Sequence, residues 1–363
     1  SEPVMGAIRT LHAWAGTALS ILAVLFGLTG SLLVFEDDWI RATVPAARAE
    51  IDLDAARLGA ALNRLEAAEP RLTSVVLPGG AVGVHRLYLA DDDFGYADAD
   101  GKVVDSWRGA ARAETWIFDL HHELLAGHTG KLVAGGAGLA LALMILTGLI
   151  VWIPAWRATG WRVWPRSGAR RELIGSHRNL GLIFAIPLVV FSLTGGAIVF
   201  HGTTQALLGA VPAPPAPVVG TGDVDWARAL TEAQARFPEA TPRMAVRPAA
   251  PGRPATIRLK QPGEWHPNGR TTVTIDPATS RAVATSDANA LPSGVRAYNA
   301  FYPLHASSVG GWLYDAVTAL SGVAMAALGL VGAWAFLGKP RRRSPRSKPT
   351  RRGQAREGAE GSA

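Results

Sequence analysis

Four apolar runs, each about 20 residues or longer, constrain the fold of this chain more than any other feature. They cover 11–35, 132–153, 180–200 and 313–337. An α-helix rises about 1.5 Å per residue, so a run of this length can cross a hydrocarbon core about 30 Å thick. The sequence therefore predicts four membrane-spanning helices.

Two sequence features could argue against retained spans, one inside the third run and one after the first run. Pro187 interrupts the third run, but membrane helices tolerate proline where neighbouring groups satisfy the freed carbonyl. Ala47-Arg48-Ala49 resembles a signal-peptide cleavage site after the first run. The apolar core of that run is too long for a signal peptide, and we interpret it as a retained span.

Basic residues gather on one side of the predicted spans. Six arginines between the second and third runs face a single acid, Glu172, and the segment 339–363 holds nine Lys or Arg against two Glu. Short connections rich in Lys and Arg remain in the cytoplasm, so the middle loop and both termini are predicted to be cytoplasmic. We interpret the basic tail as a membrane flank and expect no nucleic-acid partner.

The composition limits the chemistry that is open to the chain. It has 363 residues, of which 48% are hydrophobic, and it has no cysteine. Disulfides, iron–sulfur clusters, thiolate zinc sites and covalent c-type haem are thereby excluded. Metal chemistry must rest on the nine histidines or on carboxylates.

The two long segments between spans are each predicted to form a small α+β lobe on the outer face. Each begins with a helix, over 52–68 with Asp52 or Asp54 as its cap, and over 225–237 with Asp225 as its cap. Strands follow in both lobes. They are predicted at 73–77 and 83–89, as a strand–turn–strand with an Asp-Gly turn at 96–104, at 256–260, and as a hairpin of 271–275 with 281–285.

The chain contains an internal duplication. His12, Gly16 and Leu28-Thr29-Gly30 match His177, Gly181 and Leu193-Thr194-Gly195 at the same spacing. The second and fourth runs match more weakly. There Leu120-His121, Gly138 and Gly148 align with Leu304-His305, Gly322 and Gly332. We interpret the chain as two copies of a unit made of a span, an outer lobe and a second span.

The duplication selects four histidines, and the predicted topology sorts them into two pairs. His12 and His177 start spans one and three on the cytoplasmic face, whereas His121 and His305 start spans two and four on the outer face. Haem iron takes two axial ligands from opposite sides of a flat ring, and facing helices can supply them. The sequence predicts two haem sites, each held by one pair.

Other interpretations of these residues remain open. Single histidines near span ends can be interfacial or capping residues, and we interpret Leu-Thr-Gly as a helix-packing motif. His122 adjoins His121 and is a second choice as ligand, as is His201 at the outer end of span three. We expect His85 and His266 at the surface, and Asp91-Asp92-Asp93 in a solvated turn.

The order of these motifs resembles the PepSY-associated transmembrane-helix family. The resemblance rests on the following segments: Leu11-His12-x-Trp14-x-Gly16, Leu120-His121, His177-Arg178-x-x-Gly181, Leu304-His305 and Asp276-Pro277-Ala278-Thr279, with Ser280 where glycine is usual. It implies PepSY-like lobes, two b-type haems on His12, His177, His121 and His305, and a bacterial inner-membrane location. It also implies reduction of ferric siderophores or other ferric chelates in the periplasm.

The expected fold is a membrane α-helical protein, with a four-helix transmembrane bundle and two α+β PepSY-like periplasmic lobes. The expected boundaries are spans at 1–36, 119–154, 177–201 and 305–338, lobes at 37–118 and 202–304, a cytoplasmic loop at 155–176 and a disordered tail at 339–363.

The expected function is electron transfer from a cytoplasmic or quinol donor to a ferric chelate. No nucleotide-binding motif is present in the sequence, so a partner must supply the electrons. The alternatives are a non-redox membrane protein that binds or regulates a periplasmic partner, and a histidine-based metal transporter.

Overall fold

The computed structural model describes residues 2–155, 161–210 and 216–338. The expected tail at 339–363, residues 156–160 of the expected cytoplasmic loop and residues 211–215 of the second expected lobe lie outside the described residues.

Among the described residues, three helices are long and apolar enough to cross a membrane. They are α1 (Glu2–Leu33), α5 (Gly127–Trp152) and α12 (Gly311–Leu337). A fourth span is possible where α6 (Arg170–Ile183) and α7 (Ala185–Val199) follow one another, bent by 70° at Phe184. Proline cannot donate to the carbonyl four residues earlier. Pro187 would have to bond Ile183, the last residue of α6, so its position accounts for the break.

Glycine brings the long helices close together. α1 packs along α12, and α5 packs along α7. A Cβ atom at Gly27 would lie 2.3 Å from the carbonyl oxygen of Gly322, and one at Gly322 would lie 2.4 Å from that of Gly27. Only residues without a side chain permit this approach of two membrane helices. Much of the Gly pattern of the apolar runs therefore serves packing.

Within the described residues, the two long segments between the apolar runs together form one antiparallel sheet of eight strands, in the order β4-β3-β2-β1-β5-β6-β7-β8. The strands are β1 (Leu72–Val76), β2 (His85–Leu89), β3 (Asp93–Ala97), β4 (Val103–Arg108), β5 (Thr241–Val246), β6 (Ala255–Lys260), β7 (Thr271–Asp276) and β8 (Arg281–Ser286). Each half of the chain thus supplies four strands. The sequence did not predict β5, and its pairing with β1 merges the expected two lobes into a continuous sheet.

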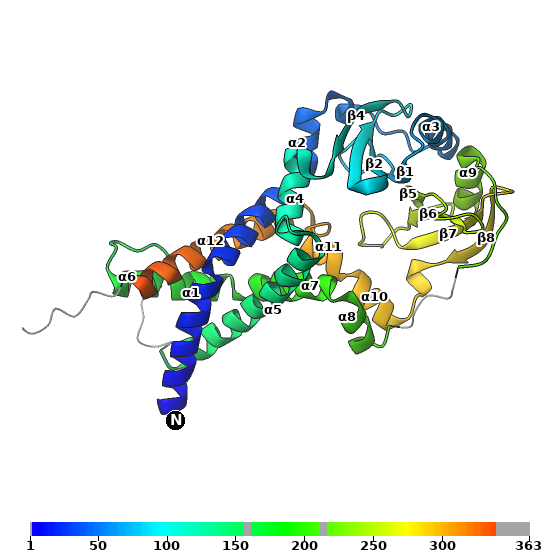
Figure 1. Ribbon diagram of the computed structural model, residues 1–363. Helices are drawn as coiled ribbons and strands as arrows, with labels where there is room; N and C mark the ends of the chain where they lie inside the picture. Colours follow the sequence, from blue (N-terminus) through cyan, green and yellow to red (C-terminus); the bar gives the residue numbers. More distant parts are fainter. Residues whose placement is uncertain (1, 156–160, 211–215, 339–363) are drawn as a thin grey trace, which may run out of the picture.

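The helices α3 (Ala55–Ala68) and α9 (Trp226–Arg236) cover one face of the sheet (Figure 1). Asp54 caps α3 through the Arg57 N–H, and Asp225 caps α9 through the Ala227 and Arg228 N–H groups. The core between helices and sheet includes Leu65 and Ile257, both fully buried. The two helices pack on each other, which doubles the core of either half.

Short helices connect the sheet to the long helices. They include α2 (Glu36–Thr43), α4 (Ala113–Glu123), α8 (His201–Leu207), α10 (Ser293–Asn299) and α11 (Phe301–His305). Figure 1 shows α4 and α11 between the sheet and the long helices. α4 ends where Leu124 and Leu125 take positive φ, before α5 begins.

The expected surface positions of His85 and His266 are wrong. His85 is fully buried and His266 is 7% exposed. His85 belongs to the inward-facing set of β2, with Leu87 and Leu89, so strand alternation already contained the signal. His266 stacks on Tyr302 of α11 with ring centres 5.0 Å apart. The aromatic partner comes from a distant part of the chain, which local patterns do not reveal.

Candidate functional site: two histidine pairs

The structure brings the four selected histidines together in the two predicted pairs. The ring centres of His121 and His305 are 6.1 Å apart, and those of His12 and His177 are 6.3 Å apart. We call these the outer pair and the inner pair. His12 lies on α1 and His177 on α6, whereas His121 and His305 lie on α4 and α11, just before the long helices α5 and α12.

The spacing within each pair matches two imidazoles that share one metal ion. A metal–nitrogen bond to imidazole is about 2.0 Å long, and the ring centre lies about 1 Å beyond the nitrogen, so opposed ligands place their ring centres about 6 Å apart. Both observed distances agree with this value. The pairs therefore have the separation that axial ligation requires.

Hydroxyl groups contact the outer pair. Nδ1 of His121 lies 2.8 Å from Oγ1 of Thr29, and Nδ1 of His305 lies 3.2 Å from Oγ1 of Thr194. Nδ1 of His305 also lies 3.0 Å from the Phe191 carbonyl oxygen. Both threonines stand in the Leu-Thr-Gly motifs, which contact a histidine in addition to packing.

In the inner pair, one histidine contacts a hydroxyl group and the other contacts a backbone carbonyl oxygen. Nδ1 of His12 lies 3.0 Å from Oγ1 of Thr147, and Nδ1 of His177 lies 3.1 Å from the Leu328 carbonyl oxygen. Thr147 belongs to a third motif, Leu146-Thr147-Gly148, which the comparison of the spans did not single out. The motif occurs three times in the sequence, and each copy contacts one of the paired histidines. This recurrence was the sequence signal that could have identified Thr147.

These contacts determine which ring nitrogen carries the proton. The hydroxyls of Thr29, Thr194 and Thr147 donate to Leu25, Val190 and Met144 carbonyl oxygens. Each threonine oxygen is then left to accept, as a carbonyl oxygen must. His305 and His177 must donate from Nδ1, because the Phe191 and Leu328 carbonyl oxygens can only accept. His121 and His12 donate from Nδ1 when the Thr29 and Thr147 hydroxyls donate to their own helices, and Nε2 then carries the free lone pair. A free Nε2 lone pair is the requirement for binding a metal.

A glycine lies against each of the four rings. Cβ atoms built at Gly30, Gly148, Gly195 and Gly332 would lie 3.1, 3.2, 2.8 and 3.0 Å from Cε1 of His121, His12, His305 and His177. In every case the glycine and its histidine come from the same half of the chain. The two histidines of a pair come from different halves. Each half therefore positions its own histidines, and the two pairs form where the halves meet.

The second-choice residues are placed differently. His122 stacks on Phe118 with ring centres 3.8 Å apart, and its Nδ1 lies 3.1 Å from the Phe118 carbonyl oxygen. His201 is exposed at the start of α8. The ring arrangement thus favours His121 over His122 as the partner of His305.

The acidic run at 91–93 is divided between two environments. Asp91 and Asp92 are turn residues with positive φ, and Asp91 is exposed. Asp93 is 7% exposed and accepts a 2.8 Å ion pair from Arg71. The run is therefore a turn followed by a buried structural ion pair.

A cavity of about 1280 Å³ connects the outer pair to the sheet. Its lining combines His121 and His305 with residues of the long helices, such as Gly138 and Met325, and residues of the lobes, such as Lys260. Ser192 also lines it, and the Ser192 hydroxyl is buried with no hydrogen-bond partner among the described residues. Buried polar groups are almost always satisfied, so this hydroxyl is a candidate hydrogen-bonding group for a molecule in the cavity.

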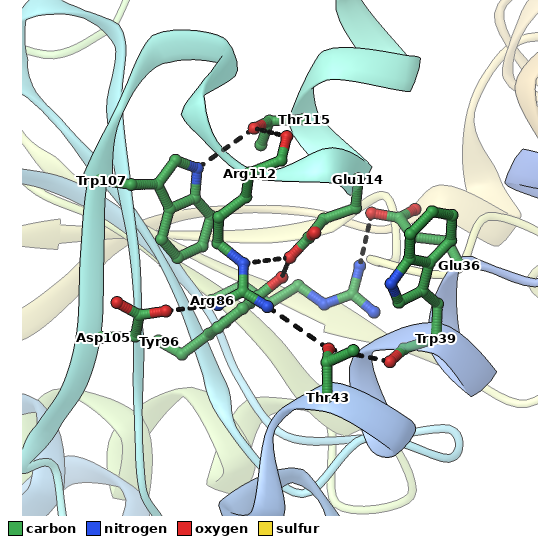
Figure 2. A network of polar contacts seen from close by, with 10 residues as sticks. All are labelled: Glu36, Trp39, Thr43, Arg86, Tyr96, Asp105, Trp107, Arg112, Glu114 and Thr115. Carbon is green, nitrogen blue, oxygen red and sulfur yellow. Dashed lines mark hydrogen bonds and ion pairs between the residues drawn. The ribbon is translucent and has the colours of Figure 1, made fainter.

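A buried polar network fixes α4, the helix that carries His121, to the first half of the sheet (Figure 2). The Glu114 carboxylate is 4% exposed and accepts from Arg112 Nε at 2.6 Å and from the Tyr96 hydroxyl at 3.0 Å. Arg112 also pairs with Asp105. Burial, reinforced by the Glu114 charge, raises the pKa of Tyr96, so its hydroxyl remains a donor. Glu114 precedes His121 by about two helical turns and shares its face.

The comparison with known families agrees with this architecture. The family model described as "PepSY-associated TM region" matches residues 9–339, which include both histidine pairs and the whole sheet. The chain belongs to the PepSY-associated TM region family. The resemblance drawn from the sequence motifs is thereby confirmed at the level of the family. No curated protein matches the chain.

Proposed function

We propose that this chain is a membrane electron-transfer protein that holds two b-type haems, one on His121 and His305 and one on His12 and His177. The observation that carries the proposal is the pairing of four histidines at 6.1 and 6.3 Å, each with Nδ1 within hydrogen-bonding distance of a hydroxyl or carbonyl oxygen. When bound, haem supplies one-electron redox chemistry. The protein's contribution is to hold and orient the ligands.

The surroundings of the outer pair are compatible with a macrocycle, because two glycines beside the rings also line a cavity. Gly30 and Gly195 lie against the rings of His121 and His305, and both line the cavity. A macrocycle supplies four of the six iron ligands, so it needs only two from the protein. A bare metal ion needs more protein ligands. Within the described part of the chain, no group of three or more His, Asp or Glu side chains is arranged to hold a metal, which favours haem over a transported ion.

The proposed substrate is a ferric chelate, including a ferric siderophore, that enters the cavity beneath the sheet. The cavity extends from the outer pair to lobe residues such as Gln261 and Asn268, so a ligand there lies beside His121 and His305. Reduction to Fe(II) weakens binding by hard oxygen ligands and releases the iron.

The proposed topology places the sheet in the periplasm and both termini in the cytoplasm of a bacterium, with the chain in the inner membrane. The basic segments of the sequence support this orientation. A quinol or a cytoplasmic protein would donate electrons at the inner pair.

The visible spectrum of the purified full-length protein tests this proposal. Two bis-histidine haems per chain give a sharp reduced α-band, and a ferric chelate added to the reduced protein should reoxidise it. A colourless protein from cells fully supplied with haem would overturn the redox function and favour a partner-binding role for the lobes.

A further inference from the structure

In three of the four histidines, the residue that contacts Nδ1 directly precedes, in the sequence, the glycine that lies against the ring. Thr29, Thr147 and Thr194 each precede that glycine by one residue. In the fourth copy Val331 stands before Gly332, and His177 donates instead to the Leu328 carbonyl. The motif therefore has a hydroxyl form and a carbonyl form.

The carbonyl form also has a fixed position. Leu328 lies four residues before Gly332, and Phe191 lies four residues before Gly195. His305 contacts both Thr194 and the Phe191 carbonyl, so it combines the two forms. His121 and His12 each contact a threonine hydroxyl through Nδ1. The four histidines thus differ in how much they depend on a threonine.

We propose that Thr29, Thr147 and Thr194 are positioning residues. They hold His121, His12 and His305 in the tautomer that can bind iron, and they set the basicity of Nε2 as an iron ligand. Each hydroxyl donates to a carbonyl of its own helix and accepts from Nδ1. An accepted Nδ1 hydrogen makes the imidazole more basic at Nε2 and fixes the ring orientation. This inference rests on the proposed haem function.

The geometry ranks the three threonines. Replacement by valine keeps the shape and removes the acceptor. Thr29→Val and Thr147→Val leave His121 and His12 without their acceptor, whereas after Thr194→Val the Phe191 carbonyl still accepts from His305 at 3.0 Å. Thr29→Val and Thr147→Val should therefore have clearly larger effects than Thr194→Val.

The experiment is a spectroelectrochemical titration of the full-length protein in detergent, with haem-to-protein ratio measured alongside. Loss of such an outer contact typically weakens metal binding about 10-fold to 100-fold. If the affinity for ferric haem falls tenfold and the affinity for ferrous haem is unchanged, the midpoint potential of the one-electron couple rises by about 59 mV. We expect that rise for the outer haem in Thr29→Val and for the inner haem in Thr147→Val.

Two further variants separate positioning from packing. Thr29→Ser keeps a hydroxyl and should restore the potential. Thr17→Val removes a threonine of the same helix whose hydroxyl bonds only its own backbone, at Ala13, and should leave both potentials unchanged.

The outcomes distinguish this inference from the proposed function. Wild-type protein without haem overturns the function itself. Wild-type protein with two haems and unshifted potentials in Thr29→Val and Thr147→Val overturns only the role of the threonines. Lower thermal stability with unshifted potentials would likewise assign the hydroxyls to packing. Equal shifts in all three valine variants would overturn the ranking.

Discussion

The outer and inner histidine pairs have nearly the same ring spacing but very different surroundings. His121 and His305 stand on short helices beside the lobes, and a cavity of about 1280 Å³ opens onto them. His12 and His177 stand on α1 and α6, against glycines of α5 and α12, and the lining of that cavity includes neither.

The duplication does not explain this difference, because it relates the two partners within each pair, His12 with His177 and His121 with His305. The ring-centre distances of the two pairs are nevertheless similar, at 6.1 and 6.3 Å. Access differs, because the lobes were placed on one side only. Under the proposed function, the outer pair would exchange electrons with a substrate in the cavity, and the inner pair would only receive electrons. The following predictions test this comparison.

The strongest test removes one histidine from each pair. His305→Ala and His177→Ala should each remove roughly half of the haem, because each site loses one of two axial ligands. His305→Ala should also abolish reoxidation by a ferric chelate. Haem-to-protein ratio and redox spectra measure both effects. His201→Ala, at an exposed residue, is the matched control, and unchanged haem in His177→Ala would refute the inner site.

Acidification should reduce the folding stability of the sheet through His85. Burial lowers the pKa of His85 to about 4, and neither ring nitrogen has a well-aligned hydrogen bond, although the Ala99 backbone opposes the shift. His85 takes up a proton near pH 6.5 in the unfolded chain, but in the folded lobe it does so only near pH 4. Folding stability is therefore complete above about pH 6.5 and decreases by roughly 3 kcal/mol as the pH falls to about 4.

Thermal unfolding between pH 7 and pH 4, followed by tryptophan fluorescence, measures this effect. His85→Leu should flatten the pH dependence, and His128→Leu, at an exposed residue, should not. An identical pH profile for wild type and His85→Leu would contradict the prediction.

The network in Figure 2 should matter to the outer pair and not to the inner pair. Glu114→Ala leaves Arg112 Nε and the Tyr96 hydroxyl without their acceptor, which costs about 2 kcal/mol. Because α4 carries both Glu114 and His121, the outer haem should be lost first on heating. Asp100→Ala removes a solvent-exposed pair with Arg64 and serves as the control. Simultaneous loss of both haems would argue against this link.

The smallest predicted effect concerns the glycines beside the rings. Alanine at Gly195 would place Cβ 2.8 Å from Cε1 of His305, closer than at Gly332, Gly30 or Gly148. We expect Gly195→Ala to lower the affinity of the outer site for haem about tenfold. Gly148→Ala should lower the affinity of the inner site least. Haem dissociation rates measure the ranking. Gly136→Ala, which would meet no atom within 4 Å, should match wild type.

The sequence predicted the apolar spans because span length and hydropathy are local properties. It also selected His12, His121, His177 and His305, because a duplication leaves matched residues at matched spacing. Asp54 and Asp225 were identifiable as helix caps for the same local reason. The family assignment followed from the order of these motifs and was confirmed.

Other features depended on contacts between distant segments. β5 has no strong pattern of its own, and it is defined by pairing with β1 and β6. His266 is buried by Tyr302 of α11, and the two are far apart in the chain. The Leu-Thr-Gly motif was interpreted as packing because its second contact, with a histidine, crosses between helices.

The amino-acid sequence by itself thus determined which four histidines belong together and that they repeat. The tertiary structure decided which nitrogen of each ring is free, which pair opens onto a cavity, and how two lobes become one sheet. The physical reason is that hydropathy and spacing are carried by neighbouring residues. Hydrogen-bond partners, cavities and strand pairing exist only after distant residues have met.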